Sequence, residues 1–344
     1  MFPDAIGGKN CTLCKDPMAS GIVRLLARTL RDVTSVRGED LRSDRAEPLE
    51  NPSEAPQKVS SPAKAQVVCV ASGKGGTGKT VVTTNLAAAL SGAGLRVTLL
   101  DADMGLANAH MLMGVAPEHD VSAVLEGRMH MPEIAVECEG GAKLVAGGTG
   151  LAWLSELPFG KLKLLADEIA LLEEESDLIL VDLAAGIGPQ VMRFLAAAHS
   201  IVLVTTPDPT ALLDAYATIK SLCAAGVAGR VRIVVNRARD RQDAIEAFKK
   251  IQAVAARQGL SADISFFGWV PHHWFVQESV AWRRPVVLAH PRSAVAQRIF
   301  AVAEALKAEH SGFAVRQNVI PISEGAGAPE PAASFASRLA HSPF

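Results

Sequence analysis

A glycine-rich run with two lysines carries the strongest chemical signal in the chain. It reads Gly-Lys-Gly-Gly-Thr-Gly-Lys-Thr over residues 73–80 and fits the pattern G-x-x-x-x-G-K-[ST]. Glycines let successive backbone N–H groups turn inward around phosphate oxygens, and a helix that begins here adds the positive end of its dipole. We therefore predict a nucleotide phosphate site formed by Gly73, Gly75, Gly76, Thr77, Gly78, Lys79, Thr80 and Val81.

The context of this loop is the one that the motif requires. The β-rich run 66–71 ends just before it, and the helical run 79–92 begins at its end. Lys79 is expected to place its charge on the β- and γ-phosphates, and the Thr80 hydroxyl is expected to ligate Mg²⁺. The second lysine, Lys74, is not needed to hold one nucleotide and requires a separate explanation.

Three aspartates follow apolar runs that are typical of strands. Asp101 and Asp103 follow one run and Asp182 ends another. Two carboxylates two residues apart at the carboxyl end of a strand can both face a nucleotide, and we expect Asp101 to support the Mg²⁺ shell. Asp182 is expected to hold Mg²⁺ through water. A single aspartate at a strand end often only caps a helix, so the argument depends on all three together with the loop.

Residues 65–310 alternate short β-rich runs with helical stretches. The expected strands are nearly continuously apolar, as in strands that are covered on both faces; they are 66–71, 96–101, 177–182, 200–205, 232–236 and 264–268. The expected helices are 79–92, 161–175, 209–225, 240–258 and 293–309. This order predicts one large α/β domain with a mostly parallel sheet and helices on both faces. Ligands bind such sheets at the carboxyl ends of the strands.

The composition excludes several classes of protein. The chain has 344 residues, 49% of them hydrophobic, a net charge of −2 and five cysteines. A globally basic nucleic-acid binder and a disulfide scaffold are both disfavoured. The first residues lack the basic and apolar regions of a signal peptide, and we expect a cytoplasmic protein.

The two ends of the chain differ from the middle. Residues 1–64 lack apolar periodicity after Leu30 and are expected to be mostly disordered, with a short partner-binding helix near 18–30 as one interpretation and a frayed terminus as the other. Residues 311–344 begin with a stretch rich in Gly, Pro and Ala. We predict a flexible linker there, followed by a short tail helix.

The tail segment 332–341 separates apolar from polar residues when it is drawn as a helix. The apolar side carries Ala332, Phe335, Ala336, Leu339 and Ala340, whereas Ser334, Ser337, Arg338 and His341 lie opposite. We predict binding to an anionic membrane surface; a tail without structure is the alternative. Burial of Phe335 and Leu339 contributes roughly 1.5–3 kcal/mol each, so one copy binds marginally and two copies in a dimer would act together.

Lys74 gives the loop its resemblance to a known family. The sequence K-G-G-T-G-K-T resembles the deviant Walker A ATPases of the MinD/ParA family, whose signature is K-G-G-x-G-K-[ST]. The resemblance implies that Lys74 reaches across an ATP-dependent homodimer to the nucleotide of the partner subunit. It also implies slow ATP hydrolysis with Lys74, Lys79 and Asp103 as catalytic residues, Asp103 helping to position the attacking water. Asn236, with Pro207 alongside, would recognise adenine, and ATP rather than GTP is likewise implied.

Longer runs are similar to one branch of that family. D-A-D-M-G-L-A-N (101–108), V-D-L-A-A-G-I-G (181–188) and T-T-P-D-P-T-A-L-L-D-A-Y-A-T-I-K (205–220) resemble segments of the flagellar-number regulators, the FlhG/FleN group. Within the last run, Thr210 is expected to cap a helix and Asp208 to suit its positive end. Departures include Val81-Val82 after the loop threonine and His110 where Asp is usual.

The likeness to these regulators implies a switch that controls flagellar number and placement. ATP would drive dimerisation and reversible association with the inner face of the cytoplasmic membrane. The implied partners are a GTPase of the signal-recognition type, FlhF, and/or a flagellar transcription activator. The segment 16–25 resembles a GTPase-stimulating peptide of that group only with a gap, and its Gln is missing.

Three alternatives stay open. Division-site placement of the MinD type is the nearest. A partition ATPase of the ParA type would need a basic DNA-binding face. Arginines late in the chain could contribute to it, namely Arg283, Arg284, Arg292 and Arg298. A solvated rim is the better interpretation of these arginines, and we expect no sequence-specific nucleic-acid binding. An iron–sulfur carrier usually has C-x-x-C in its C-terminal half, where this chain has only Cys223, whereas Cys11 and Cys14 form half a tetrahedral site.

Overall fold

The computed structural model describes residues 65–103, 107–148, 159–227, 230–260, 262–318 and 334–340. The predictions for 1–64, including the partner-binding helix and the cysteine pair, lie outside these residues. The same holds for most of the linker between 311 and the tail helix.

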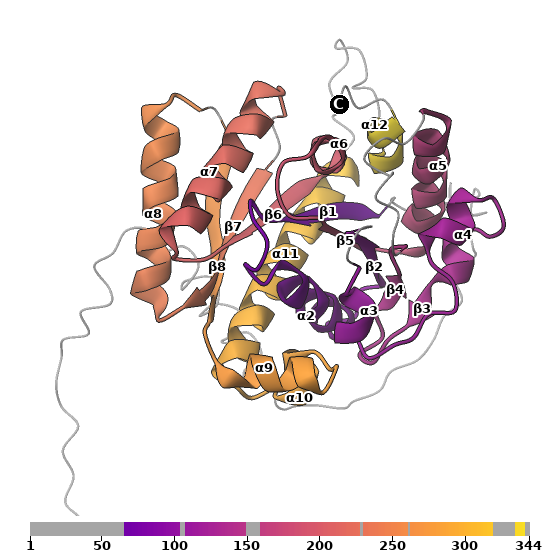
Figure 1. Ribbon diagram of the computed structural model, residues 1–344, viewed down its shortest axis with the longest axis horizontal. Coiled ribbons are helices and arrows are strands. Elements are labelled where there is room, and N and C mark those ends of the chain that lie inside the picture. The colour runs from indigo at the N-terminus through magenta and orange to yellow at the C-terminus, as the bar shows by residue number, and fades with distance from the viewer. Residues whose placement is uncertain are drawn as a thin grey trace, which may run out of the picture. The chain divides into compact units, whose positions relative to one another are not determined.

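An eight-stranded sheet forms the centre of the described part, in the order β3-β4-β2-β5-β1-β6-β7-β8 (Figure 1). Every neighbouring pair is parallel except β3 with β4. The strands are β1 (Gln66–Ala71), β2 (Val97–Ala102), β3 (Val136–Glu137), β4 (Lys143–Val145), β5 (Leu178–Leu183), β6 (Ser200–Thr205), β7 (Arg230–Ala238) and β8 (Asp263–Pro271). Every residue of β1, β2, β5 and β6 is buried, which confirms the inference from their continuous apolar runs.

Helices cover both faces of the sheet. Val67 and Cys69 of β1 belong to one apolar core, and Val68 and Val70 belong to the other, because successive side chains of a strand point to opposite faces. The first core is shared with α4 (Val121–Leu125), α5 (Phe159–Glu175), α6 (Pro189–Ala197), α7 (Pro209–Ala224), α8 (Arg241–Arg257) and α12 (Phe335–Ala340). The second is shared with α2 (Lys79–Gly92), α3 (Ala109–Leu112), α9 (Trp274–Ala281), α10 (Val286–Ala289) and α11 (Ala294–Asn318).

The predicted fold class is confirmed: one α/β domain with a mostly parallel sheet between two helical layers. Short elements were not predicted. They are β3, β4, the 3₁₀ turn Met131–Ile134 and the helices α3, α4, α6, α9 and α10. Most of these elements are only two to five residues long, and such runs are too brief to display a clear apolar period. None of the helices in the described ranges combines the length and the apolar run that a membrane span requires.

The tail helix is present, but its apolar side is not free. Phe335, Ala336 and Leu339 of α12 are buried, and the helix packs against α5 and α6. The ring centroid of Phe335 lies 6.0 Å from that of Phe194 on α6. In this conformation the domain itself therefore covers the apolar side, and the expected binding to a membrane stays a prediction. Ala332 and His341 lie outside the described residues.

Two polar contacts fix the ends of this docked helix. The Ala336 N–H donates to Oε1 of Glu173 on α5 at 3.2 Å, and Nε of Arg338 donates to the carbonyl oxygen of Ala197 on α6 at 2.8 Å. Burial lowers the pKa of Arg338 below its usual value. The helix is thus attached mainly by apolar area, with one hydrogen bond to each supporting helix.

Candidate functional site

The loop between β1 and α2 needs its glycines for two different reasons. Gly76 and Gly78 have φ angles of 80° and 84°, which favour glycine. A Cβ on Gly73 would lie 2.4 Å from the backbone carbonyl of Asp214, and one on Gly78 would lie 2.3 Å from Nδ2 of Asn236. Above Gly75 and Gly76, by contrast, a Cβ would meet nothing within 4 Å. The loop is therefore packed tightly against the domain at its ends and open in its middle, as a phosphate cradle must be.

Four side chains form a polar cluster directly behind the loop, the phosphate-loop cluster of Lys79, Thr80, Thr83 and Asp182. Thr80 is half-buried and the other three are buried. Nζ of Lys79 lies 2.9 Å from Oδ1 of Asp182. The hydroxyls of Thr80 and Thr83 each donate to the same carboxylate at 2.7 Å. The structure thus joins Lys79 and Thr80 to Asp182, which lies about one hundred residues later in the sequence, and adds Thr83. The position of Thr83, one helical turn after Lys79, is the signal that could have shown it.

Asp101 lies beside Asp182, because β2 and β5 are neighbours and these two residues are paired in register. Burial and the Asp182 carboxylate raise the pKa of Asp101 to about 7. Its two oxygens accept hydrogen bonds from the backbone N–H groups of Asp103 at 3.1 Å and Ala109 at 3.0 Å. Asp101 therefore holds both ends of the segment that follows β2. Asp103 is partly exposed at the start of that segment, and residues 104–106 are outside the described part.

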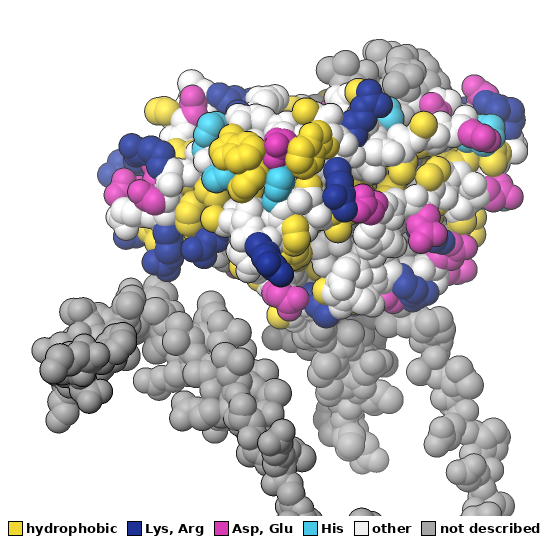
Figure 2. Space-filling view, turned by 90° about the horizontal axis from the view of Figure 1, so that it is seen from below, with side chains coloured by type: hydrophobic (Ala, Val, Ile, Leu, Met, Phe, Trp, Pro, Cys, Tyr) yellow, Lys and Arg dark blue, Asp and Glu magenta, His cyan; other side chains and the backbone are white. Residues whose placement is uncertain are grey.

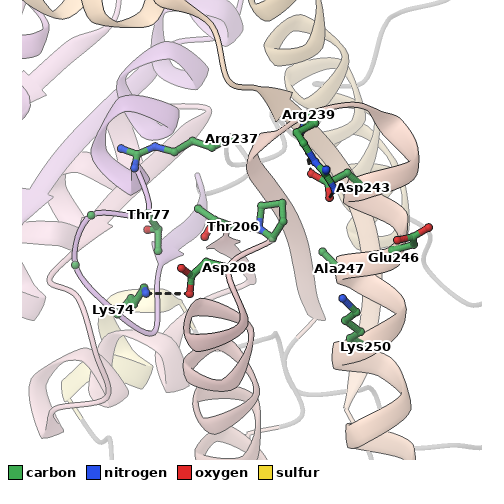
Figure 3. A pocket seen from close by; sticks show the side chains of 13 residues that line it. Lys74, Thr77, Thr206, Asp208, Arg237, Arg239, Asp243, Glu246, Ala247 and Lys250 are labelled. Atoms are coloured by element: carbon green, nitrogen blue, oxygen red, sulfur yellow. Dashed lines mark hydrogen bonds and ion pairs between the residues drawn. The ribbon is translucent and has the colours of Figure 1, made fainter.

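Lys74 contacts a helix of its own chain. Its Nζ donates to the Thr210 hydroxyl and lies 3.4 Å from Oδ1 of Asp208, both at the start of α7. Asp208, and not Thr210 as predicted, is the N-cap of α7, since its side chain accepts from the N–H groups of Thr210 and Ala211. Hydrogen bonds from Thr210 and Ala211, with a smaller effect of Lys74, lower the pKa of Asp208 to about 2. Lys74 is thus held on one side of the open loop (Figure 3).

Two cavities adjoin the loop. The larger, of about 700 Å³, has Lys74, Thr77, Pro207 and Asp208 on its wall and extends to Arg239 and to Asp243, Glu246 and Lys250 of α8 (Figure 3). The smaller, of about 200 Å³, is lined by Gly78, Val81, Asn236, Pro271 and His272, among others. Pro207 and Asn236, expected side by side, line different cavities.

Asn236 uses its amide inside the protein. Its Nδ2 donates to the Thr77 carbonyl oxygen at 2.8 Å, and its Oδ1 accepts from the N–H of Arg237 at 2.9 Å. Arg237 lines both cavities and has a φ angle of 57°, in the left-handed region. Asn236 therefore ties β7 to the phosphate loop, and its expected contact with adenine remains a prediction. No sequence pattern indicated that Arg237 lies between the two cavities.

Comparison with known proteins decides the family. The profile described as "ParA: NUBPL iron-transfer P-loop NTPase" matches residues 63–307. The chain belongs to the MinD/ParA family of P-loop ATPases. It is 36% identical to the antiactivator FleN of Pseudomonas aeruginosa over 70% of this chain and 85% of FleN. It is 31% identical to the flagellum site-determining protein YlxH of Helicobacter pylori over 69% of this chain and 80% of that protein.

Solved structures of the family have the same fold. The cell-division ATPase MinD of Pyrococcus furiosus is 25% identical with a TM-score of 0.60, covering 71% of this chain and 99% of MinD. MinD of Pyrococcus horikoshii, solved in complex with Mg-ADP, is 27% identical with a TM-score of 0.58, covering 70% of this chain and 96% of that one. The expected resemblance to the MinD/ParA family, and to its flagellar branch, is confirmed.

The residues present fit a magnesium nucleotide. The Thr77 hydroxyl oxygen is buried without a hydrogen-bond partner among the described residues, in a loop whose centre is open. Within the described ranges, no group of three or more His, Cys, Asp or Glu side chains could hold a metal ion without help. Mg²⁺ at Thr80 and Asp182 would thus depend on phosphate oxygens for the rest of its shell.

Proposed function

We propose that this chain is an ATP-dependent dimerisation and membrane-association switch that regulates flagellar number and placement from the inner face of the cytoplasmic membrane. The flagellar branch is supported by the identity to FleN, which exceeds the identity to the MinD structures described above. The switch is supported by the state of Lys74.

The contact of Lys74 with α7 is the observation that carries the proposal. Lys74 lies beside the open phosphate loop and is bound by Asp208 and Thr210 of its own chain. The side chain is about one-third exposed, so an incoming subunit can reach it. Dimerisation would exchange these acceptors for the triphosphate of the partner subunit, which couples nucleotide occupancy to quaternary state.

The other residues of the site divide the chemistry of hydrolysis. Lys79 would hold the β- and γ-phosphates, while Thr80 and Asp182 would hold Mg²⁺, which when bound neutralises charge on the phosphate oxygens. Asp103 would orient the attacking water. Asp101 positions the segment that carries Asp103 through its bonds to the N–H groups of Asp103 and Ala109. Slow turnover would then return the monomer, so hydrolysis serves timing.

The tail helix offers a route from the nucleotide to the membrane. Residues 183–188 connect Asp182 to α6, and the N–H of Gly186 donates to the Ser72 carbonyl next to the phosphate loop at 2.9 Å. Helix α6 in turn supports Phe335 and Arg338 of α12. A nucleotide that shifts this connection would loosen the tail, and the freed apolar side could enter the bilayer surface.

Magnitudes support a reversible tail. Phe335 and Leu339 contribute roughly 1.5–3 kcal/mol each when buried, whether the domain or lipid covers them. Arg338 would add about 1 kcal/mol on anionic lipid. The free energies of α12 on the domain and on lipid are thus close. A small change at α6, together with two linked tails in a dimer, is enough to shift the helix from the domain to the lipid.

Dimerisation is tested with two variants in the full chain. Asp103→Ala is expected to accumulate an ATP-bound dimer in size-exclusion chromatography with Mg²⁺, and Asp103→Ala combined with Lys74→Ala is expected to stay monomeric. A monomeric Asp103→Ala protein, or a double variant that dimerises equally well, would contradict the switch.

Membrane association is tested with one charge placed on either side of α12. Leu339→Glu is expected to abolish ATP-dependent binding to anionic vesicles, whereas Ser337→Glu, on the polar side, should reduce it only slightly. Equal binding by wild type and Leu339→Glu would remove the tail from the proposal.

Partner proteins remain proposals as well. They are an FlhF-type GTPase and/or a flagellar transcription activator, and the relative FleN is itself named an antiactivator. The peptide 1–30 should accelerate the GTPase; unchanged GTP turnover would leave the transcription activator as the proposed target.

The iron-transfer name of the matching profile makes an iron–sulfur carrier the second candidate. The described cysteines are Cys69 and Cys138, both buried, and the half-buried Cys223. Burial raises the pKa of Cys69 above its usual value and that of Cys138 to about 12, which disfavours the thiolate that iron needs. Protein as purified should contain neither iron nor sulfide.

A further inference from the structure

Two tryptophans lie exposed on one helical stripe. Trp274 begins α9 and is 56% exposed, and Trp282, the C-cap of the same helix, is 57% exposed. Positions eight apart on a helix share a face and lie about 12 Å apart along its axis. Figure 2 looks onto the side where α9 lies, and hydrophobic side chains gather there beside histidine and acidic ones. Tryptophan is enriched among the residues that contribute most of the binding energy at protein interfaces.

The surrounding rings hold this stripe in place. Phe275 stacks on His290 with centroids 4.1 Å apart, and the Trp282 ring lies 5.4 Å from that of His290. Trp274 contacts Phe275 at 4.1 Å. Oε2 of Glu278, between the two tryptophans, lies 2.7 Å from Nε2 of His290. A partner would therefore meet preformed aromatic surfaces and lose little side-chain entropy.

The charges on the segment 272–292 favour an acidic partner. It contains three arginines, Arg283, Arg284 and Arg292, and a single carboxylate, Glu278, which already contacts His290. Arg284 is bound by Glu139, with Nε 2.9 Å from Oε2. Arg283, next to Trp282, is exposed and makes no ion pair with any residue that the structure describes. Its charge is available to a carboxylate.

A cavity opens beside Arg283. It has a volume of about 520 Å³, and its wall includes His110, Met111 and His119 together with two carboxylates, Glu118 and Asp120, of which Asp120 already accepts from the Ser122 N–H. The cavity reaches Gly147, where a Cβ would lie 2.5 Å from the Asp101 carbonyl oxygen. His110 belongs to α3, whose first N–H is bound by Asp101. A side chain in this cavity would contact the elements that position Asp103.

We propose that Trp274, Trp282 and Arg283, together with this cavity, form a docking surface for an acidic, apolar segment of a partner protein. Apolar side chains of the segment cover the two tryptophans and enter the cavity, and a carboxylate pairs with Arg283. Binding there bears on Asp101 and the segment after β2, so the partner alters ATP turnover. That last step rests on the proposed function; the docking itself does not.

The test uses a random peptide library displayed on phage, selected on the full-length chain and counter-selected on the Trp274→Ala, Trp282→Ala double variant. We expect enriched peptides in which Asp or Glu flanks Leu, Ile or Phe. Arg283→Glu should weaken the best peptide about tenfold or more, whereas Arg283→Lys should keep most of the affinity. Val254→Ala, at another exposed apolar side chain on α8, is the matched control and should bind as wild type.

The outcomes separate docking from the proposed function. Enrichment of basic peptides, or no enrichment over the double variant, overturns the docking surface. So does binding of duplex DNA or anionic vesicles that is lost in the same variants, because the surface would then serve a different ligand. Circular dichroism verifies that each variant is folded. Peptide binding persists if the chain hydrolyses no ATP, so failure of the switch and failure of the surface give different results.

Discussion

The phosphate-loop cluster and the docked tail helix lie at the two ends of one connection, yet different forces hold them. In the first, Asp182 receives three donors at 2.7–2.9 Å, so each atom has an assigned place. In the second, Phe335 and Leu339 are fully buried, and each supporting helix adds one hydrogen bond. Directional polar contacts suit a site that must distinguish a ligand, whereas apolar area suits a helix that must attach and detach.

The largest expected effect is on ATP turnover, after a substitution in the phosphate-loop cluster. Lys79→Ala removes the ammonium group from Asp182 and from any bound phosphate, and we expect ATP turnover to fall by about 100-fold or more. Thr80 and Thr83 still donate to Asp182, so the chain should fold. Lys143→Ala, which removes an exposed lysine paired with Glu175, is the matched control and should retain turnover. Comparable turnover in Lys79→Ala would remove the phosphate loop from catalysis.

The next effect is the pH dependence of stability, which we expect His199 to control. Burial, with a smaller effect of Arg338, lowers the pKa of His199 to about 4, and its Nδ1 accepts from the Val67 N–H at 2.9 Å. The unfolded chain binds this proton more tightly, so the contribution is full above pH 6.5 and is lost as pH falls toward 4. The loss should approach about 3 kcal/mol.

His199→Asn keeps an acceptor for Val67 but cannot titrate. Denaturant unfolding at several pH values should show a flatter acid limb for this variant. Parallel curves for wild type and variant would mean that His199 does not control the acid dependence.

A smaller effect is expected at the apolar end. Leu339→Ala removes most of one buried side chain and should weaken attachment of α12 by about 2 kcal/mol, because the helix can detach and limit the loss. Hydrogen exchange at the Ala336 amide, which is bound to Glu173, measures attachment directly. Leu213→Ala, at an exposed leucine of α7, should leave that exchange rate unchanged. Equal protection in Leu339→Ala would mean that polar contacts hold the tail.

The smallest effect tests that last point. Arg338→Ala deletes the bond to Ala197, but it also releases a buried charge whose Nη2 has no hydrogen-bond partner among the described residues. The two consequences oppose each other, and attachment should change by less than about 1 kcal/mol. If the same exchange measurement shows a loss as large as that of Leu339→Ala, then polar contacts, as in the phosphate-loop cluster, hold α12.

Sequence reasoning was most successful where the chemistry is local. The glycine run, Lys79 and Thr80 are contiguous, and Asp101 and Asp182 each lie one residue before the carboxyl end of a strand, so a parallel sheet had to bring them to one edge. It was less successful in predicting which hydrogen-bond partners a side chain has. Asp208 rather than Thr210 caps α7, and Asn236 binds the Thr77 carbonyl. These hydrogen-bond partners depend on small differences in the distance between segments that are far apart in the chain.

Trp274 and Trp282 illustrate the same limit at the surface. Their spacing is visible in the sequence, but an apolar residue on a short helix is usually buried, and only the packing of Phe275 and His290 shows that these two stay outside.

By itself the sequence determined the α/β fold, the phosphate loop and the amphipathic tail, because each follows from a period or motif within a single segment. The tertiary structure decided that Lys74 binds its own α7 and that the tail covers α5 and α6. The apolar side of an amphipathic helix must be buried, and the ammonium group of a lysine must be paired with an anion. Which surface buries the helix and which carboxylate pairs with the lysine depend on how distant segments pack.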